Sequence, residues 1–161
     1  MTSTPTYISL LNAISVTETS AGEIFENWAG SVSDKKLEKT LRLIEMREKE
    51  HGIAFAKRML ELGYEVQASG PDLLEELRKI ASSNRSELSK LKALKYNKAP
   101  VSPDIFDGMF SDKTIDPVTG GLLGRYIAEE RDTGRLLRSE CQRLQDKEKK
   151  AKERLKAKAA K

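Results

Sequence analysis

Three glutamates and one histidine stand where helical spacing would otherwise place apolar side chains. Glu48 and His51 are three residues apart and share one helix face, while Glu18 and Glu130 take the same kind of position in two other segments. Buried carboxylates are costly unless they are protonated, paired or bound to a cation, and a divalent or trivalent metal removes their mutual repulsion. Carboxylate oxygens with one imidazole suit iron or manganese, and sometimes zinc.

The sequence therefore predicts a metal site with Glu18, Glu48, His51 and Glu130 as its ligands. Other interpretations of these residues stay open at this point. Glu48 and His51 lie in the highly charged run MREKEH, which is also typical of a solvated face, and Glu18 lies among polar residues. A phase error of one position would replace Glu130 by Glu129.

Four further side chains are weaker candidates for the same site. Glu45 lies one turn before Glu48, and Tyr126 lies beside the apolar stripe of the last helix, where it could hydrogen-bond a ligand. Asn84 and Glu87 lie on the third helical segment.

Four helical segments would have to position these ligands. They cover residues 6–30, 33–62 and 71–94, with a fourth running from about residue 120 into the C-terminal tail. We expect Ser33 to cap the start of the second helix and Gly63 to end it. Apolar residues recur at steps of three and four, which is typical of bundle helices with shallow crossing angles. These residues are Tyr7, Leu11, Ile14, Ala21, Phe25 and Trp28 in the first segment; Leu37, Leu41, Ile44, Phe55 and Met59 or Leu62 in the second; and Leu123, Ile127, Leu137, Cys141 and Leu144 in the last.

The pattern indicates an all-α four-helix bundle over residues 1–146, followed by a basic tail over residues 147–161. A long irregular connection, residues 95–119, precedes the last helix, and we expect its apolar cluster to dock on the bundle. That cluster is Ile105, Phe106, Met109 and Phe110. Beyond Leu144 the apolar stripe fades, so the helix is expected to fray or to project into solvent.

Charge and composition exclude several classes of protein. The tail carries a net charge of +6 and the remaining residues −2, although the whole chain is +4. Lysines without interleaved aromatic residues allow phosphate contacts with nucleic acid, but we favour a solubilising helix end. The single cysteine excludes internal disulfides and cysteine-rich metal sites within the chain. No secretory signal and no membrane-length apolar run is visible in the sequence, so we expect a cytoplasmic protein.

Two stretches resemble the first half of a rubrerythrin or ferritin domain. They are AISVTETSAGEIFENWAG and LEKTLRLIEMREKEHGIAFAKRMLELGY, and the resemblance is strongest over residues 7–64. It implies that Glu18 is the ligand of the first helix and that Glu48 and His51 are those of the second. In YIAEERDTGRLLR, Glu130 fits a carboxylate of a later helix. The second Glu-x-x-His of rubrerythrins is missing, and Glu129 to Asp132 is its nearest substitute.

The resemblance implies a non-haem iron site, mononuclear or di-iron, with manganese as the alternative metal. It also implies ferroxidase or peroxidase-like oxidoreductase activity, although kinship of fold does not establish catalysis. The competing hypothesis is a non-catalytic helical interaction protein that kept the bundle and lost the full site. We further expect a homo-oligomer, most simply a dimer.

Overall fold

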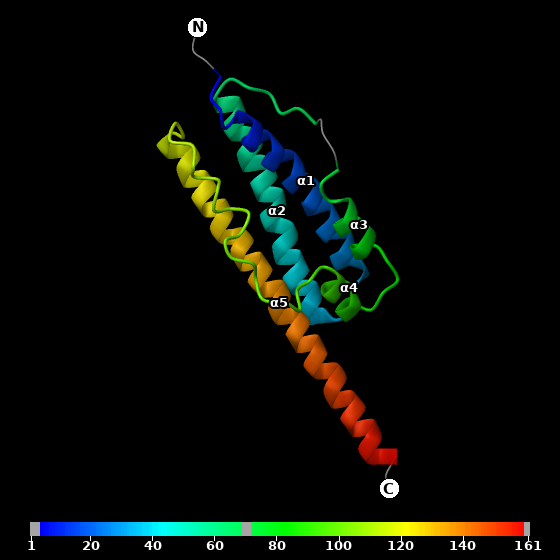
Figure 1. The fold of residues 1–161 in the computed structure, drawn as a ribbon. Coiled ribbons are helices and arrows are strands. Elements are labelled where there is room, and N and C mark those ends of the chain that lie inside the picture. Colours follow the sequence, from blue (N-terminus) through cyan, green and yellow to red (C-terminus); the bar gives the residue numbers. More distant parts are fainter. Residues whose placement is uncertain (1–3, 69–71, 160–161) are drawn as a thin grey trace.

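The computed structural model describes residues 4–68 and 72–159. All of the regular secondary structure in those ranges is helical, and irregular segments connect the helices. Three long helices lie side by side, and two short helices pack near one end of them (Figure 1). The described helices are α1 (Ile8–Ser31), α2 (Lys35–Glu61), α3 (Glu75–Ala81), α4 (Glu87–Ala93) and α5 (Pro117–Ala159). The prediction of an all-α fold is confirmed.

The third helix is not the continuous segment that the sequence pattern suggested. It divides into α3 and α4, because the polar run between them offers the backbone other partners. The Ser82 and Ser83 hydroxyls donate to the carbonyls of Arg78 and Ile80 at the end of α3, and the Ser86 side chain caps the start of α4. The expected helix start at Gly70 and Pro71 lies outside the described residues.

The N-terminal cap of α2 is Asp34, not Ser33 as expected. The Asp34 carboxylate accepts from the backbone amides of Lys36 and Leu37 and also pairs with Arg143 of α5. An aspartate accepts hydrogen bonds from the free backbone amides as a serine would, and its charge also allows an ion pair with an arginine on another helix. The other end of α2 is as predicted, because Gly63 takes a φ of 83° there.

Two glycines allow α1 and α2 to pack closely at the height of the candidate site. A Cβ at Gly52 would lie 2.5 Å from the Thr19 hydroxyl oxygen, and one at Gly22 would lie 2.6 Å from the Lys49 side chain. The Ser15 hydroxyl also donates to the Gly52 carbonyl at 3.0 Å. This close approach places Glu18 of α1 beside the ligands predicted on α2.

The apolar core of the described residues forms two clusters rather than one. The first cluster surrounds Trp28, and the second surrounds Phe55. Their buried members are Ile24, Phe25, Trp28, Ala29, Val32, Leu37, Leu41, Ile44, Ala81, Leu91, Leu137 and Cys141 in the first, and Tyr7, Leu11, Ile14, Phe55, Met59, Leu123, Tyr126 and Ile127 in the second. On α1, α2 and α5 alike, the candidate ligands fall between the members of one cluster and those of the other.

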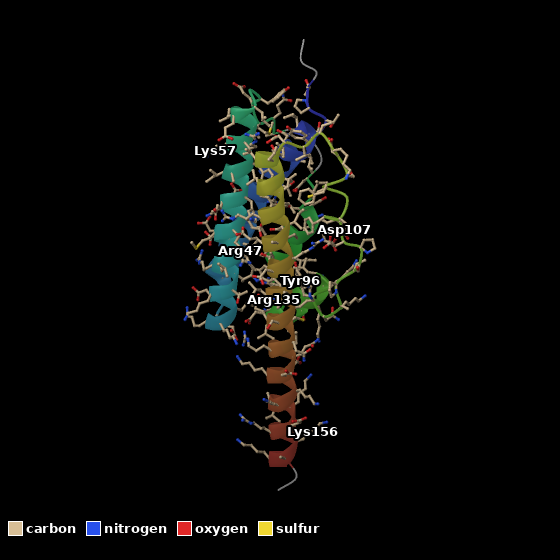
Figure 2. The ribbon with its side chains drawn as sticks, turned by 90° about the vertical axis from the view of Figure 1, so that its left-hand side faces the viewer. Arg47, Lys57, Tyr96, Asp107, Arg135 and Lys156 are labelled. Carbon is tan, nitrogen blue, oxygen red and sulfur yellow. The ribbon has the colours of Figure 1, made fainter. Side chains whose placement is uncertain are left out.

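The connection from α4 to α5 runs back along α5 (Figure 1). Phe106 and Met109 pack on the second cluster as expected, whereas Ile105 and Phe110 are exposed, which corrects that part of the prediction. Asp104 and Asp107 both pair with Arg131 of α5, and Asp107 lies on the connection in Figure 2. Packing and ion pairs therefore hold this irregular segment against α5.

The basic tail remains helical as far as Ala159. It continues α5 beyond the other helices, and Lys156 lies on this projecting part (Figures 1 and 2). All residues from Asp146 to Ala159 are helical and exposed. Within residues 4–68 and 72–159, no helix is both long enough and apolar enough to cross a membrane.

Deleting residues 149–161 should leave the free energy of unfolding unchanged to within about 0.5 kcal/mol, because the described part of this segment buries no apolar side chain. The cut spares Lys147, which pairs with Asp34. Chemical denaturation measures the effect. Asp34→Ala is the comparison and should cost about 1–2 kcal/mol through the lost cap. A loss of that size on truncation would show that the tail packs against something.

Candidate metal centre

Glu18, Glu48, His51 and Glu130 lie together between the two apolar clusters. One oxygen or nitrogen from each side chain falls within 4.8 Å of those of the other three. Glu18 comes from α1, Glu48 and His51 from α2, and Glu130 from α5, so three helices build the site. The first three are buried and Glu130 is partly buried. The predicted convergence is observed, and ligation of a metal by these residues stays a prediction.

The two ring nitrogens of His51 face different groups. Nδ1 lies 3.5 Å from Glu130 Oε1 and 3.9 Å from Glu48 Oε2, inside the cluster. Nε2 lies 2.6 Å from Glu129 Oε2, outside it. If Nε2–H donates to Glu129, Nδ1 can present its lone pair to a cation among the carboxylates.

Glu129 has a role that the sequence pattern did not assign. The pattern offered Glu129 as a substitute for Glu130 or as part of a second ligand pair, but the two neighbours contact opposite sides of the same ring. Glu129 also accepts from Arg125, which in turn pairs with Glu50 at the surface. In the sequence, only its position next to Glu130 in the run AEERD indicated that Glu129 could lie near the site.

Tyr126 holds Glu18 in place. Its hydroxyl donates to Glu18 Oε1 at 2.8 Å, and its ring contacts those of His51 and Phe55 edge-on at 5.0 and 5.3 Å between centroids. The suggestion that Tyr126 hydrogen-bonds a ligand side chain therefore agrees with the structure. Buried tyrosine hydroxyls usually find such a partner, and here the partner is one of the carboxylates of the site.

Two buried polar atoms of the cluster have no hydrogen-bond partner among the described residues. They are His51 Nδ1 and Glu130 Oε1. Leaving such atoms unpaired costs about 1–3 kcal/mol each, so they usually mark a bound species or a strained functional group. Both point into the same cluster and both are metal-donor atoms, so the residues present fit a cation.

Burial and mutual repulsion shift the protonation equilibria of the site. Burial raises the pKa of Glu18 to about 10, with contributions from the hydrogen bond and charge of Glu48 and the charge of Glu130. Burial also raises the pKa of Glu130, and the nearby His51 opposes this shift. For His51, burial lowers the pKa, but the surrounding carboxylates outweigh it and raise the pKa to about 10. Without a metal, the cluster holds protons at neutral pH.

The other three weaker candidates, Glu45, Asn84 and Glu87, lie outside the cluster. Glu45 is buried but pairs with Arg42 and Lys49. Glu87 accepts from the Trp28 indole and pairs with Lys90 at the first apolar cluster. Their charges are already matched, so neither needs a metal. Asn84 is exposed.

Asp132 does not complete a second ligand pair with Glu129. It pairs with Arg47 and Arg135, and its pKa is lowered by those two guanidinium groups. Tyr96, at the start of the connection, packs against the first apolar cluster. Burial and the charges of Glu130 and Glu48 raise its pKa to about 12.

Comparison of the chain with protein-family models, curated proteins and solved structures finds no match. The chemistry of the site therefore follows from its geometry. That geometry places three carboxylates and one imidazole, from three helices, in a largely buried space with two donor atoms free.

Glu18→Gln should stabilise the metal-free protein at about pH 8 by about 1 kcal/mol or more, roughly one pKa unit's worth. A folded pKa near 10, against an ordinary value of 4.5, gives stability that is full below the ordinary value and is lost as pH rises. His51 contributes with the same sign above its ordinary value of 6.5. Metal-free wild type should therefore lose stability from about pH 6 to pH 9, and Glu18→Gln should lose less.

Denaturant unfolding of chelator-treated protein across this pH range measures both slopes. Glu23→Gln is the matched control, because Glu23 is an exposed glutamate on the same helix. Equal slopes for the Glu18 and Glu23 variants would show that Glu18 is not held protonated.

Proposed function

We propose that this protein binds a metal ion through Glu18, Glu48, His51 and Glu130, as a ferritin-like protein with a non-haem iron or manganese site. The observation that carries the proposal is the buried convergence of these four side chains with two donor atoms unpaired. Hard carboxylate oxygens with one imidazole nitrogen suit iron and manganese. The cation would offset the cost of grouping three carboxylates.

Each group of residues at the site has a distinct role in this proposal. The carboxylates and His51 Nδ1 supply the donor atoms, and Glu129 holds the other ring nitrogen, as partners beyond the ligands commonly do. Tyr126 orients Glu18. The apolar clusters on either side limit access of water.

The finer proposal is a ferroxidase or peroxidase-like oxidoreductase. Iron at such a site would supply one-electron chemistry, passing from Fe(II) to Fe(III) in reaction with dioxygen or peroxide. Support comes from the order of the ligands, which is a glutamate from the first helix, Glu-x-x-His from the second and a carboxylate from the last. The four donors are enough for one ion, and Glu129 is already engaged by His51.

The competing function is that of a non-catalytic interaction protein. The raised pKa values of Glu18 and His51 and the closeness of Glu129 to His51 favour it, because protons on Glu18 and His51 would relieve much of the repulsion in the cluster without any metal. The two proposals differ in whether added metal displaces these protons.

Chelator-treated wild type should bind close to one Mn(II) or anaerobic Fe(II) per chain, and Glu48→Gln should bind at least about tenfold more weakly. Binding should weaken as pH falls, because protons compete with the metal for His51 and the carboxylates. Calorimetric titration and elemental analysis measure the affinity and the stoichiometry. Added metal should also raise the melting temperature of wild type.

Glu23→Gln serves again as the exposed-glutamate control and should bind like wild type. A wild type that takes up well under one ion per chain, with no thermal shift, would favour the interaction protein. Binding that Glu48→Gln leaves unchanged would place the metal elsewhere.

A further inference from the structure

The face of α2 opposite the core carries a stripe of large apolar side chains in contact with solvent. Leu43, Met46, Ile53 and Leu60 are 43, 68, 71 and 63% exposed. With the exposed residues Lys39, Glu50 and Lys57 they form a continuous series at steps of four and three, named here the α2 outer stripe. Lys57 points away from the bundle in Figure 2. This spacing is that of a coiled-coil seam, and the distance from Leu43 to Leu60 is about 26 Å along the helix.

The charges within the stripe favour one arrangement of two copies. A parallel pairing would set Glu50 against the partner's Glu50 and Lys57 against the partner's Lys57, and both contacts are repulsive. An antiparallel pairing in which Leu43 meets the partner's Leu60 instead brings Glu50 within one turn of the partner's Lys57.

The same antiparallel register uses all four apolar residues. Ile53 comes to lie near the two-fold axis, beside its own copy, and Met46 packs on the aliphatic stem of the partner's Lys57. Lys39 falls close to the partner's Glu61, a residue that is exposed at the end of α2. If the partner is shifted by seven residues, so that Leu43 meets the partner's Ile53, Lys39 comes to lie opposite the partner's Lys57. The repulsion between these two lysines disfavours the shifted register.

We propose that the α2 outer stripe is a homodimer interface at which two copies pack antiparallel about a two-fold axis near Ile53. The partner is a second copy of this chain because the stripe is complementary in charge to itself only in this orientation. Glu50 and Lys57 already pair within the chain with Arg125 and Glu61, but these pairs are exposed, so they are weak and can be shared with the partner.

The interface does not depend on the metal centre. Glu48 and His51 lie on the opposite face of α2, at the height of the proposed axis. Changes in the outer stripe should therefore leave the metal cluster intact, which separates failure of this inference from failure of the proposed function.

Sedimentation equilibrium of the full chain from about 1 to 200 µM should show a dimer, and Ile53→Glu should raise the dissociation constant at least about 100-fold. The matched control is Leu155→Glu, because Leu155 is 67% exposed but lies on the projecting tail. It should dimerise like wild type. Unchanged far-UV circular dichroism and unchanged metal uptake would show that Ile53→Glu remains folded.

A charge exchange tests the register. Glu50→Lys and Lys57→Glu should each weaken the dimer about tenfold or more, whereas the double variant should recover most of the affinity, since it restores opposite charges across the axis. A wild type that stays monomeric over the whole range overturns the proposal. So does a dimer that Ile53→Glu leaves intact, and failure of the double variant to recover overturns the antiparallel register.

Discussion

The structure depends on the burial of an acidic cluster between two apolar ones. Glu18, Glu48 and Glu130 interrupt the core at one height, and the helices continue past them on apolar contacts at both ends. Desolvation of these carboxylates opposes folding, while the apolar clusters favour it. The metal-free protein meets this cost with protons and with the single histidine, and a bound cation would meet it without them.

Close packing of α1 and α2 brings the ligand side chains of these two helices together. Gly22 and Gly52 let the two backbones approach, so Glu18 faces Glu48 and His51 directly. On the other side α5 lies where its Glu129 and Glu130 can reach both nitrogens of the imidazole. The irregular connection is fastened to α5 by ion pairs with Arg131, and its Phe106 ring meets the Tyr126 ring edge-on. The four candidate ligands therefore come from only three helices.

The helix α2 has two functional faces in our proposals. Its inner face supplies Glu48 and His51, and its outer face presents an apolar stripe that the rest of the described chain leaves uncovered. Both faces follow from helical periodicity, since residues three and four apart share a side. The two proposals are independent because they rest on opposite sides of the helix.

The sequence by itself determined the helical class, the extent of the three long helices to within a few residues, and the four candidate ligands. Steps of three and four carry that information, because a helix fixes which residues share a face. Only the tertiary structure decided that the third segment divides, that Asp34 rather than Ser33 caps α2, and that Glu129 joins Glu130 at His51. Each of these depends on competition between local partners or on a contact between segments distant in the chain, and helical spacing contains neither.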